Sequence, residues 1–103
     1  MRANAFLACV AAAAAGFHAP GALAVEARYL CDDGSKIAAS FVGGIEAPGA
    51  VTLRFADGRT VTLAQAASAD GGRYADAAME FWSKGRGATL TREGHATSCR
   101  PAP

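Results

Sequence analysis

Alternation of apolar and polar residues is the dominant pattern of this chain after residue 25, and glycine-containing turns interrupt it at short intervals. A period of two places successive side chains on opposite faces of a β-strand. No segment in this region shows a long apolar period of 3.6 residues, which a helix would require. The pattern therefore predicts strands at 25–31, 35–42, 50–56, 59–63, 73–74, 79–84, 88–91 and 95–100.

Turn signals between these strands limit the possible architectures. Asp57-Gly58 lies between two alternating segments, which is a strong hairpin signal. Asp70-Gly71-Gly72 supplies two glycines that tolerate positive φ angles. Short strands with turns roughly every 8–12 residues favour an all-β fold, either an antiparallel sandwich or a small barrel. The alanine-rich segment 64–69 could form a helical turn and is left unassigned.

The first 24 residues have the pattern of a secretory signal peptide. Arg2 precedes an apolar run at 5–16, and Ala22-Leu23-Ala24 fits a cleavage site. Cys9 has too few apolar residues before it to suit a lipid-modified cysteine, and the apolar run continues beyond it. We therefore expect cleavage after Ala24, no membrane anchor, and a periplasmic or secreted domain at 25–103.

Two cysteines, Cys31 and Cys99, remain after removal of the leader. In an exported protein this count predicts one disulfide, which would stabilise the fold by about 4 kcal/mol through the long loop that it closes. That is comparable with the whole net stability of a small domain. Two cysteines without a cluster of histidines or carboxylates do not complete a zinc site, so no metal is expected.

Charge and motifs argue against nucleic-acid binding and against catalysis. The formal net charge of +1 falls to about zero once Arg2 is removed, which leaves no basic field for a nucleic acid. His95 lies beside a turn without a nearby acid or nucleophile, and no serine has the context of a nucleophile elbow. No glycine-rich loop of the phosphate-binding type precedes a helix. We expect a binding protein without a cofactor, and not an enzyme.

Two motifs carry a resemblance to a known family. Ser68-Ala69-x-Gly71-x-Arg73-Tyr74, followed by Phe81-Trp82-Ser83-Lys84-Gly85, resembles the signature of the bacterial inhibitors of c-type lysozyme, both membrane-bound and periplasmic. The similarity extends to Tyr29-x-Cys31 and to Cys99, so it covers nearly all of the chain after residue 25. The resemblance implies an antiparallel barrel of about eight strands, with the first and last strands joined by the disulfide. It also implies c-type lysozyme as the protein partner.

The same resemblance implies which residues would bind lysozyme. In the family, the lysine of the second motif and a serine of the preceding turn enter the lysozyme cleft and engage its two catalytic carboxyl groups. Lys84 matches the lysine, whereas Asp70 stands where the family has the serine, and Ser68 is the serine that this chain retains. Gly87 also stands where the family usually has glutamate. The expected binding residues are Lys84, Asp70, Ser68, Arg73, Tyr74, Trp82 and Gly85.

Strand parity alone permits a different interpretation of the second motif. It places Trp82 and Lys84 on one face, where Trp82 could fill the barrel or its rim while Lys84 is a solvated charge. The alternative function is then a barrel of the same fold that binds a small ligand or an envelope component, or that has a purely structural role. A ligand-binding barrel would need an apolar interior cavity, whereas a lysozyme inhibitor would need protruding polar side chains.

The leader can be tested directly by intact-mass measurement of the exported protein. We expect a protein that begins at Val25, because Ala22-Leu23-Ala24 is an A-x-A cleavage pattern close after the apolar run. A lipid-bearing species that begins at Cys9 would contradict both the cleavage site and the absence of an anchor.

Overall fold

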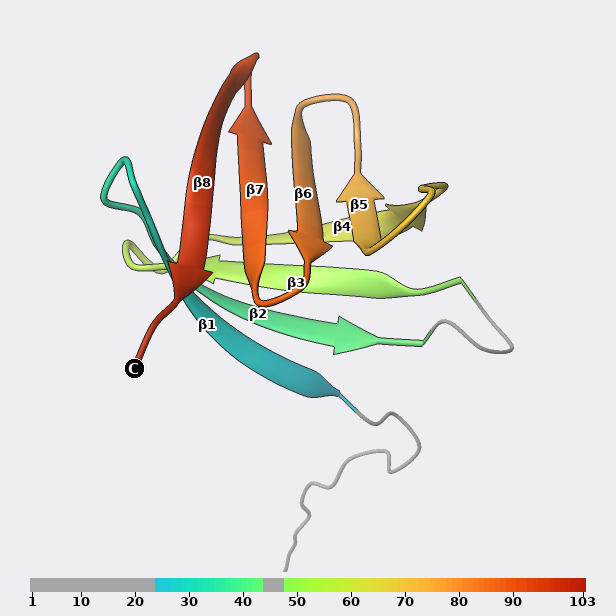
Figure 1. Cartoon of the computed structure of the whole chain (residues 1–103), viewed down its shortest axis with the longest axis horizontal. Helices are drawn as coiled ribbons and strands as arrows, with labels where there is room; N and C mark the ends of the chain where they lie inside the picture. The colour runs from blue at the N-terminus through green and yellow to red at the C-terminus, as the bar shows by residue number, and fades with distance from the viewer. Residues whose placement is uncertain (1–23, 44–47) are drawn as a thin grey trace, which may run out of the picture.

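Eight antiparallel strands form a closed barrel in the computed structural model, which describes residues 24–43 and 48–103 (Figure 1). Each strand pairs with its neighbours in the sequence, and β8 returns to pair with β1. The strands are β1 Val25–Cys31, β2 Lys36–Val42, β3 Ala50–Phe55, β4 Thr60–Ala66, β5 Gly72–Ala75, β6 Met79–Lys84, β7 Gly87–Arg92 and β8 His95–Pro101. The predicted fold class is confirmed, and of the two architectures left open the barrel is the one observed. The leader expected at 1–24 lies almost wholly outside the described residues.

Two groups of strands cross each other in the barrel. In Figure 1, β1 to β4 run across the picture while β5 to β8 run up and down. Closure comes from the register of β1 against β8, in which Tyr29 lies opposite Pro101 and Cys31 opposite Cys99. Because the first strand, β1, pairs with the last strand, β8, neither strand leaves an open sheet edge where the barrel closes. No helix within the described part of the chain is long and apolar enough to cross a membrane.

The alanine-rich segment that the sequence left unassigned is part of a strand. β4 continues to Ala66, and its last residues pair with β5 in the register Ala64 to Ala75 and Ala66 to Arg73. The Gln65 side-chain oxygen accepts a hydrogen bond from the Gly49 amide at 3.2 Å, which ties this end of β4 to the start of β3. Cross-strand pairing therefore decides the conformation of a segment whose own propensity is weak.

Inward-pointing side chains fill the barrel. The largest of those that are less than 2 % exposed are Phe81, Leu53, Leu63, Leu90 and Val51. Aromatic rings pack among them: Tyr29 meets Phe81 edge-on with ring centroids 5.5 Å apart, and Phe41 lies 5.6 Å from Tyr74. Burying these side chains is the main favourable term in folding. The interior is a packed core.

Several tight turns use the glycines and acids that the sequence places there. Glu93 and Gly94 both have positive φ angles, 52° and 84°, as a type I′ hairpin turn requires. Gly85 has a φ angle of 59° and opens the two-residue turn between β6 and β7, as in a type II′ turn. In the turns after β1 and β3, backbone amides hydrogen-bond to Asp33 and Asp57, which lowers the pKa of both carboxyl groups.

A disulfide joins Cys31 to Cys99, as the cysteine count predicted. The two residues lie directly opposite each other in the pairing of β1 with β8, and both side chains are buried. The bond therefore connects the first and last strands of the barrel at the seam where it closes. It closes a loop with a sequence separation of 68 residues, which in the chain-entropy model stabilises the fold by about 4 kcal/mol.

Loss of this disulfide should strongly destabilise the protein. We expect Cys31→Ser/Cys99→Ser to lower the free energy of unfolding by about 4 kcal/mol, since the unfolded chain regains its loop entropy. Urea unfolding of this variant and of the oxidised protein measures the difference. An unchanged unfolding free energy would mean that strand pairing and core packing close the barrel without the covalent bond.

Candidate functional site

An exposed lysine and an exposed aspartate meet at one end of the barrel. Lys84 is the last residue of β6, and Asp70 lies in the turn that connects β4 with β5. Their charged atoms, Lys84 Nζ and Asp70 Oδ1, are 3.9 Å apart, and the two side chains are 55% and 70% exposed. Lys84 and Asp70, both among the expected binding residues, therefore lie side by side at one end of the barrel. We call residues 68–72 together with Trp82, Lys84 and Gly85 the Lys84 tip.

Trp82 forms the support beneath this pair. Its indole Nε1–H donates a hydrogen bond to the backbone carbonyl of Asp70 at 3.1 Å, which fastens the turn to β6. The Lys84 ammonium lies 5.1 Å from the centre of the Trp82 ring, within the range of a cation–π contact. Trp82 is partly buried on the outer surface of the barrel, on the same strand face as Lys84. It therefore holds both the turn backbone and the lysine, and it does not fill the barrel.

Gly71 allows the turn to approach β6 closely. Its φ angle is +69°, a conformation that residues with side chains rarely adopt. A Cβ atom there would lie 2.4 Å from the Ser83 carbonyl oxygen and 2.8 Å from Lys84 Cγ. Both the backbone conformation and the available space therefore require glycine at this position, and the place of Asp70 beside Lys84 depends on it.

Arg73 fixes the base of the same turn. Its guanidinium forms an ion pair with Glu80 on the neighbouring strand β6, and its Nη1 donates to the Ala67 carbonyl at 3.1 Å. The guanidinium carbon also lies 5.8 Å from the centre of the Trp82 ring. Arg73 is thus a positioning residue that connects the start of the turn with β6. Sequence reasoning missed Glu80, although its outward parity beside Trp82 was a usable signal.

The remaining expected residues have different places. Ser68 Oγ donates to the Gly71 carbonyl oxygen at 3.2 Å, so this hydroxyl closes the turn on itself. Gly85 bends the chain directly after Lys84. Tyr74 is 8% exposed and points into the core beside Phe41, and desolvation there raises the pKa of its hydroxyl. Tyr74 is one of the expected binding residues, but its register partner Phe81 places it on the inward face, so its ring adds little exposed area to the Lys84 tip.

The Lys84 tip has the chemistry of a binding surface. An ion pair between two exposed side chains contributes little to stability, about 0–1 kcal/mol, so the ammonium is available to a second carboxylate. The supporting contacts come from β5 and β6, which are rigid elements of the barrel. Within the described residues, no group of three or more histidines, cysteines and acids could hold a metal ion.

Comparison with known proteins places the chain in a family. The family model described as "Membrane-bound lysozyme-inhibitor of c-type lysozyme" matches residues 29–98, which is more than half of the chain. The chain belongs to this family. A curated relative from Cupriavidus necator with the name "Membrane-bound lysozyme inhibitor of C-type lysozyme" is 36% identical over 101 residues, covering 92% of this chain and 78% of the relative.

A solved structure supports the fold independently. The barrel is similar to Pseudomonas aeruginosa MliC, which was crystallised in complex with hen egg white lysozyme, with a TM-score of 0.67 and 23% sequence identity. The similarity covers 88% of this chain and 98% of that one. The members of the family are named as inhibitors, in agreement with the expectation from the sequence that this protein is not an enzyme.

Gly71→Ala should be more damaging than the same change at Gly58. Both glycines have positive φ angles, so alanine costs about 1–2 kcal/mol at either position through backbone strain. Only at Gly71 does the added methyl also meet the backbone of β6, whereas at Gly58 nothing lies within 4 Å. We expect a larger loss of unfolding free energy in urea for Gly71→Ala. A shift in tryptophan fluorescence should accompany it, since Trp82 is the single tryptophan of the chain.

Equal destabilisation by the two alanine variants, with unchanged fluorescence, would contradict this account. It would show that the turn can retreat from β6 at no cost, and that Gly71 serves only the backbone conformation.

Proposed function

We propose that this protein inhibits c-type lysozyme by inserting the Lys84 tip into the active-site cleft. The observation that carries the proposal is the exposed Lys84 ammonium, held on Trp82 beside the glycine turn at the end of β6. Membership of the inhibitor family supports the partner, and so does the likeness to the barrel that was crystallised with hen egg white lysozyme.

The chemistry of lysozyme explains why such a tip would block it. Lysozyme keeps one carboxyl group protonated as its general acid while the other stays ionised. The Lys84 ammonium would pair with the ionised carboxylate, and a polar group of the 68–72 turn would meet the protonated one. Lys84 can exchange Asp70 for the lysozyme carboxylate at small cost, because both members of the present pair are largely exposed. Substrate is then excluded without any reaction.

The packed interior argues against the alternative of a ligand-binding barrel. Each of the eight strands contributes at least one buried side chain to the core, and those of β5 and β8 are Tyr74 and Cys99. Phe81 and Leu90 have no exposed surface at all. An interior ligand would have to displace these close-packed side chains, whereas the polar side chains of the Lys84 tip already protrude.

The place of action follows from the same family. Its description as membrane-bound supports a location in the bacterial envelope, where the protein would meet lysozyme that attacks the cell wall. We propose that residues 1–24 direct the chain there as a cleaved leader, and that 25–103 form the inhibitor domain.

Removal of the Lys84 ammonium should cause the largest single loss of inhibition. If the lysine pairs with a desolvated carboxylate, Lys84→Ala should cost about 2–5 kcal/mol, much of it because the carboxylate is left unpaired. This corresponds to a loss of affinity of roughly 30-fold to several thousand-fold. Titration calorimetry against lysozyme measures it, with Lys36→Ala as the matched control, since Lys36 is an exposed lysine on β2 away from the tip. A folded Lys84→Ala protein with unchanged affinity would overturn the insertion model.

Asp70 should make inhibition depend on pH. In the cleft its carboxylate would face the lysozyme general acid, whose pKa is about 6. Below that pH the protonated acid can donate a hydrogen bond to Asp70, and above it two negative charges repel each other. At about 4 Å and an effective dielectric constant near 20, the repulsion is roughly 4 kcal/mol before Lys84 offsets part of it. We therefore expect affinity to fall as the pH rises through about 6.

Asp70→Ser should raise the affinity at neutral pH and flatten this dependence. Dissociation constants measured by calorimetry from roughly pH 5 to 8 test it without interference from lysozyme's own activity profile. Asp57→Ser is the matched control, because Asp57 is an exposed aspartate in the turn after β3. Parallel profiles for wild type and Asp70→Ser would mean that Asp70 does not meet the general acid.

A further inference from the structure

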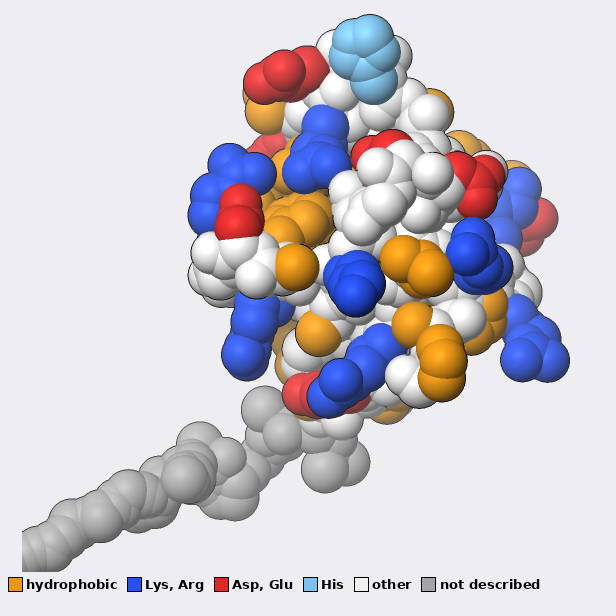
Figure 2. Space-filling model, turned by 90° about the vertical axis from the view of Figure 1, so that its left-hand side faces the viewer, with side chains coloured by type: hydrophobic (Ala, Val, Ile, Leu, Met, Phe, Trp, Pro, Cys, Tyr) orange, Lys and Arg blue, Asp and Glu red, His pale blue; other side chains and the backbone are white. Residues whose placement is uncertain are grey.

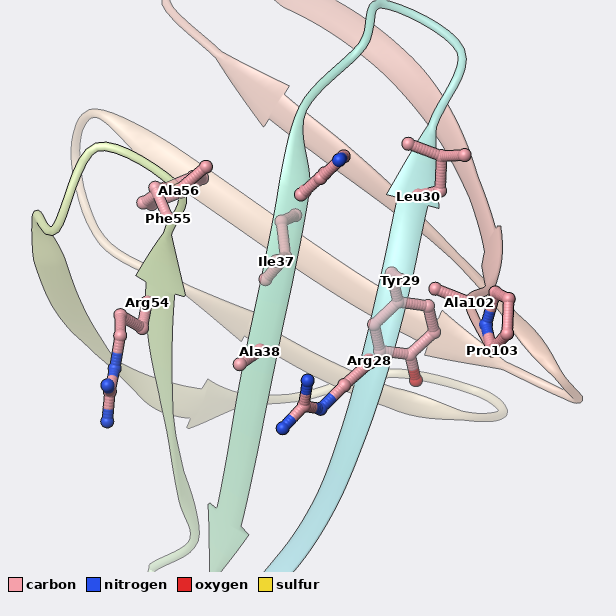
Figure 3. Close-up of a pocket in the computed structure, with 11 residues that line it drawn as sticks. Arg28, Tyr29, Leu30, Ile37, Ala38, Arg54, Phe55, Ala56, Ala102 and Pro103 are labelled. Carbon is pink, nitrogen blue, oxygen red and sulfur yellow. The ribbon is translucent and has the colours of Figure 1, made fainter.

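Unpaired cations gather at one place on the barrel. The chain has ten lysines and arginines in all, and nine of them lie in the described residues. Five of the nine form ion pairs. Among the described residues, the four without an ion-pair partner are Arg28, Lys36, Arg54 and Arg86, and the first three line one surface hollow of about 570 Å³ (Figure 3). We call this hollow, with Arg28, Lys36 and Arg54, the basic hollow.

The strand register explains how the three cations come together. Arg28 on β1 pairs with Ala38 on β2, and Ala38 pairs with Arg54 on β3. Neighbouring strands lie about 4.8 Å apart, so the two arginine backbones are separated by about 10 Å with only a methyl group between them. Lys36 stands two residues before Ala38 on the same outer face. In Figure 3 the Arg28 side chain extends from β1 toward β2, and Arg54 points outward from β3.

We propose that the basic hollow binds the phosphate groups of an anionic phospholipid surface. Guanidinium groups match phosphate oxygens in geometry and charge. All three cations are exposed and come from three neighbouring strands, so they can reach more than one phosphate of a surface that lies against the hollow. The choice of a lipid surface as the source of phosphate rests on the envelope location proposed above. Each lysine or arginine near an anionic membrane strengthens binding by about fivefold.

An acid, Glu26, lies close to the basic hollow and makes the proposal more specific. Glu26 lies two residues before Arg28 and borders the neighbouring hollow, which shares Ala38 and Arg54 with the first one. Its carboxylate does not come within ion-pair distance of either arginine in the described structure. Facing a negative membrane, Glu26 would weaken the attraction, so its removal should strengthen binding.

The basic hollow and the Lys84 tip share no residue. The hollow is built from β1, β2, β3 and the last two residues of the chain, whereas the tip is built from the turn after β4 and from β6. Figure 2 shows lysines and arginines set apart from one another over one face of the barrel, with hydrophobic side chains between them. The barrel could therefore rest on a membrane through the hollow while the tip remains open to lysozyme.

Vesicle co-sedimentation of the exported full protein tests the proposal. The probes are vesicles of phosphatidylglycerol mixed with phosphatidylcholine, compared with phosphatidylcholine alone. We expect binding to the anionic vesicles only, weakened about fivefold by Arg28→Gln or Arg54→Gln and about 25-fold by the double variant. Glu26→Gln should strengthen binding. Arg86→Gln is the matched control, because it removes an exposed arginine without an ion pair outside the hollow, and it should have little effect.

Each other outcome overturns the proposal. Equal loss with Arg86→Gln would show diffuse attraction without a defined site, and equal binding to neutral vesicles would show attachment that does not involve charge. Full competition by inorganic phosphate at constant ionic strength would assign the hollow to the free anion. Circular dichroism confirms that each variant is folded. Lysozyme inhibition by Arg28→Gln/Arg54→Gln should equal that of wild type. A failure of the membrane proposal can therefore be distinguished from a failure of the proposed inhibition by the Lys84 tip.

Discussion

The pairing of β1 with β8 is the interaction on which the rest of the structure depends. Without it the strands would form an open meander with two unpaired edges, and the inward side chains would lose their common interior. The Cys31–Cys99 bond lies in this pairing, where it connects residues from opposite ends of the chain. A domain of this size buries a small core, so a covalent link at the point of closure supplies a large part of its net stability.

The Lys84 tip is held in place by contacts with strands of the closed sheet. Asp70 and Gly71 belong to a turn, yet their positions are set by contacts with β6 through the Trp82 indole and the Lys84 side chain. Arg73 holds the beginning of the same turn from β5. The side chains of the Lys84 tip are thus held in a defined arrangement by the barrel itself, which would reduce the conformational entropy cost of the proposed binding.

Much of the fold could be predicted because it rests on local patterns. Alternation located the strands, and Asp57-Gly58 and Asp70-Gly71-Gly72 located two of the turns, since each pattern reports on its own few residues. The end of β4 was missed because alanine favours helix over strand, and the contacts that decide the strand come from β5. The inward position of Tyr74 was missed for a related reason: a two-residue segment does not reveal its register, which the pairing with Phe81 sets. For the site, the sequence indicated that Asp70 and Lys84 lie together, but the bracing by Glu80 and by the Asp70 carbonyl depends on distances between strands.

The ion pair between Lys84 and Asp70 also bears on how fast a partner would be encountered. Two opposite charges 3.9 Å apart form a dipole whose field falls off much faster than that of a lone ammonium. Beyond a Debye length this pair therefore adds almost no field of its own, and Arg86, two residues after Lys84, is the nearby cation that forms no ion pair among the described residues. The pair itself would add little electrostatic steering toward an acidic cleft to the unsteered encounter rate of about 10⁵–10⁷ M⁻¹s⁻¹. In the proposed complex the tip would recognise lysozyme at contact, and the lifetime of the complex, more than the speed of its formation, would set the affinity.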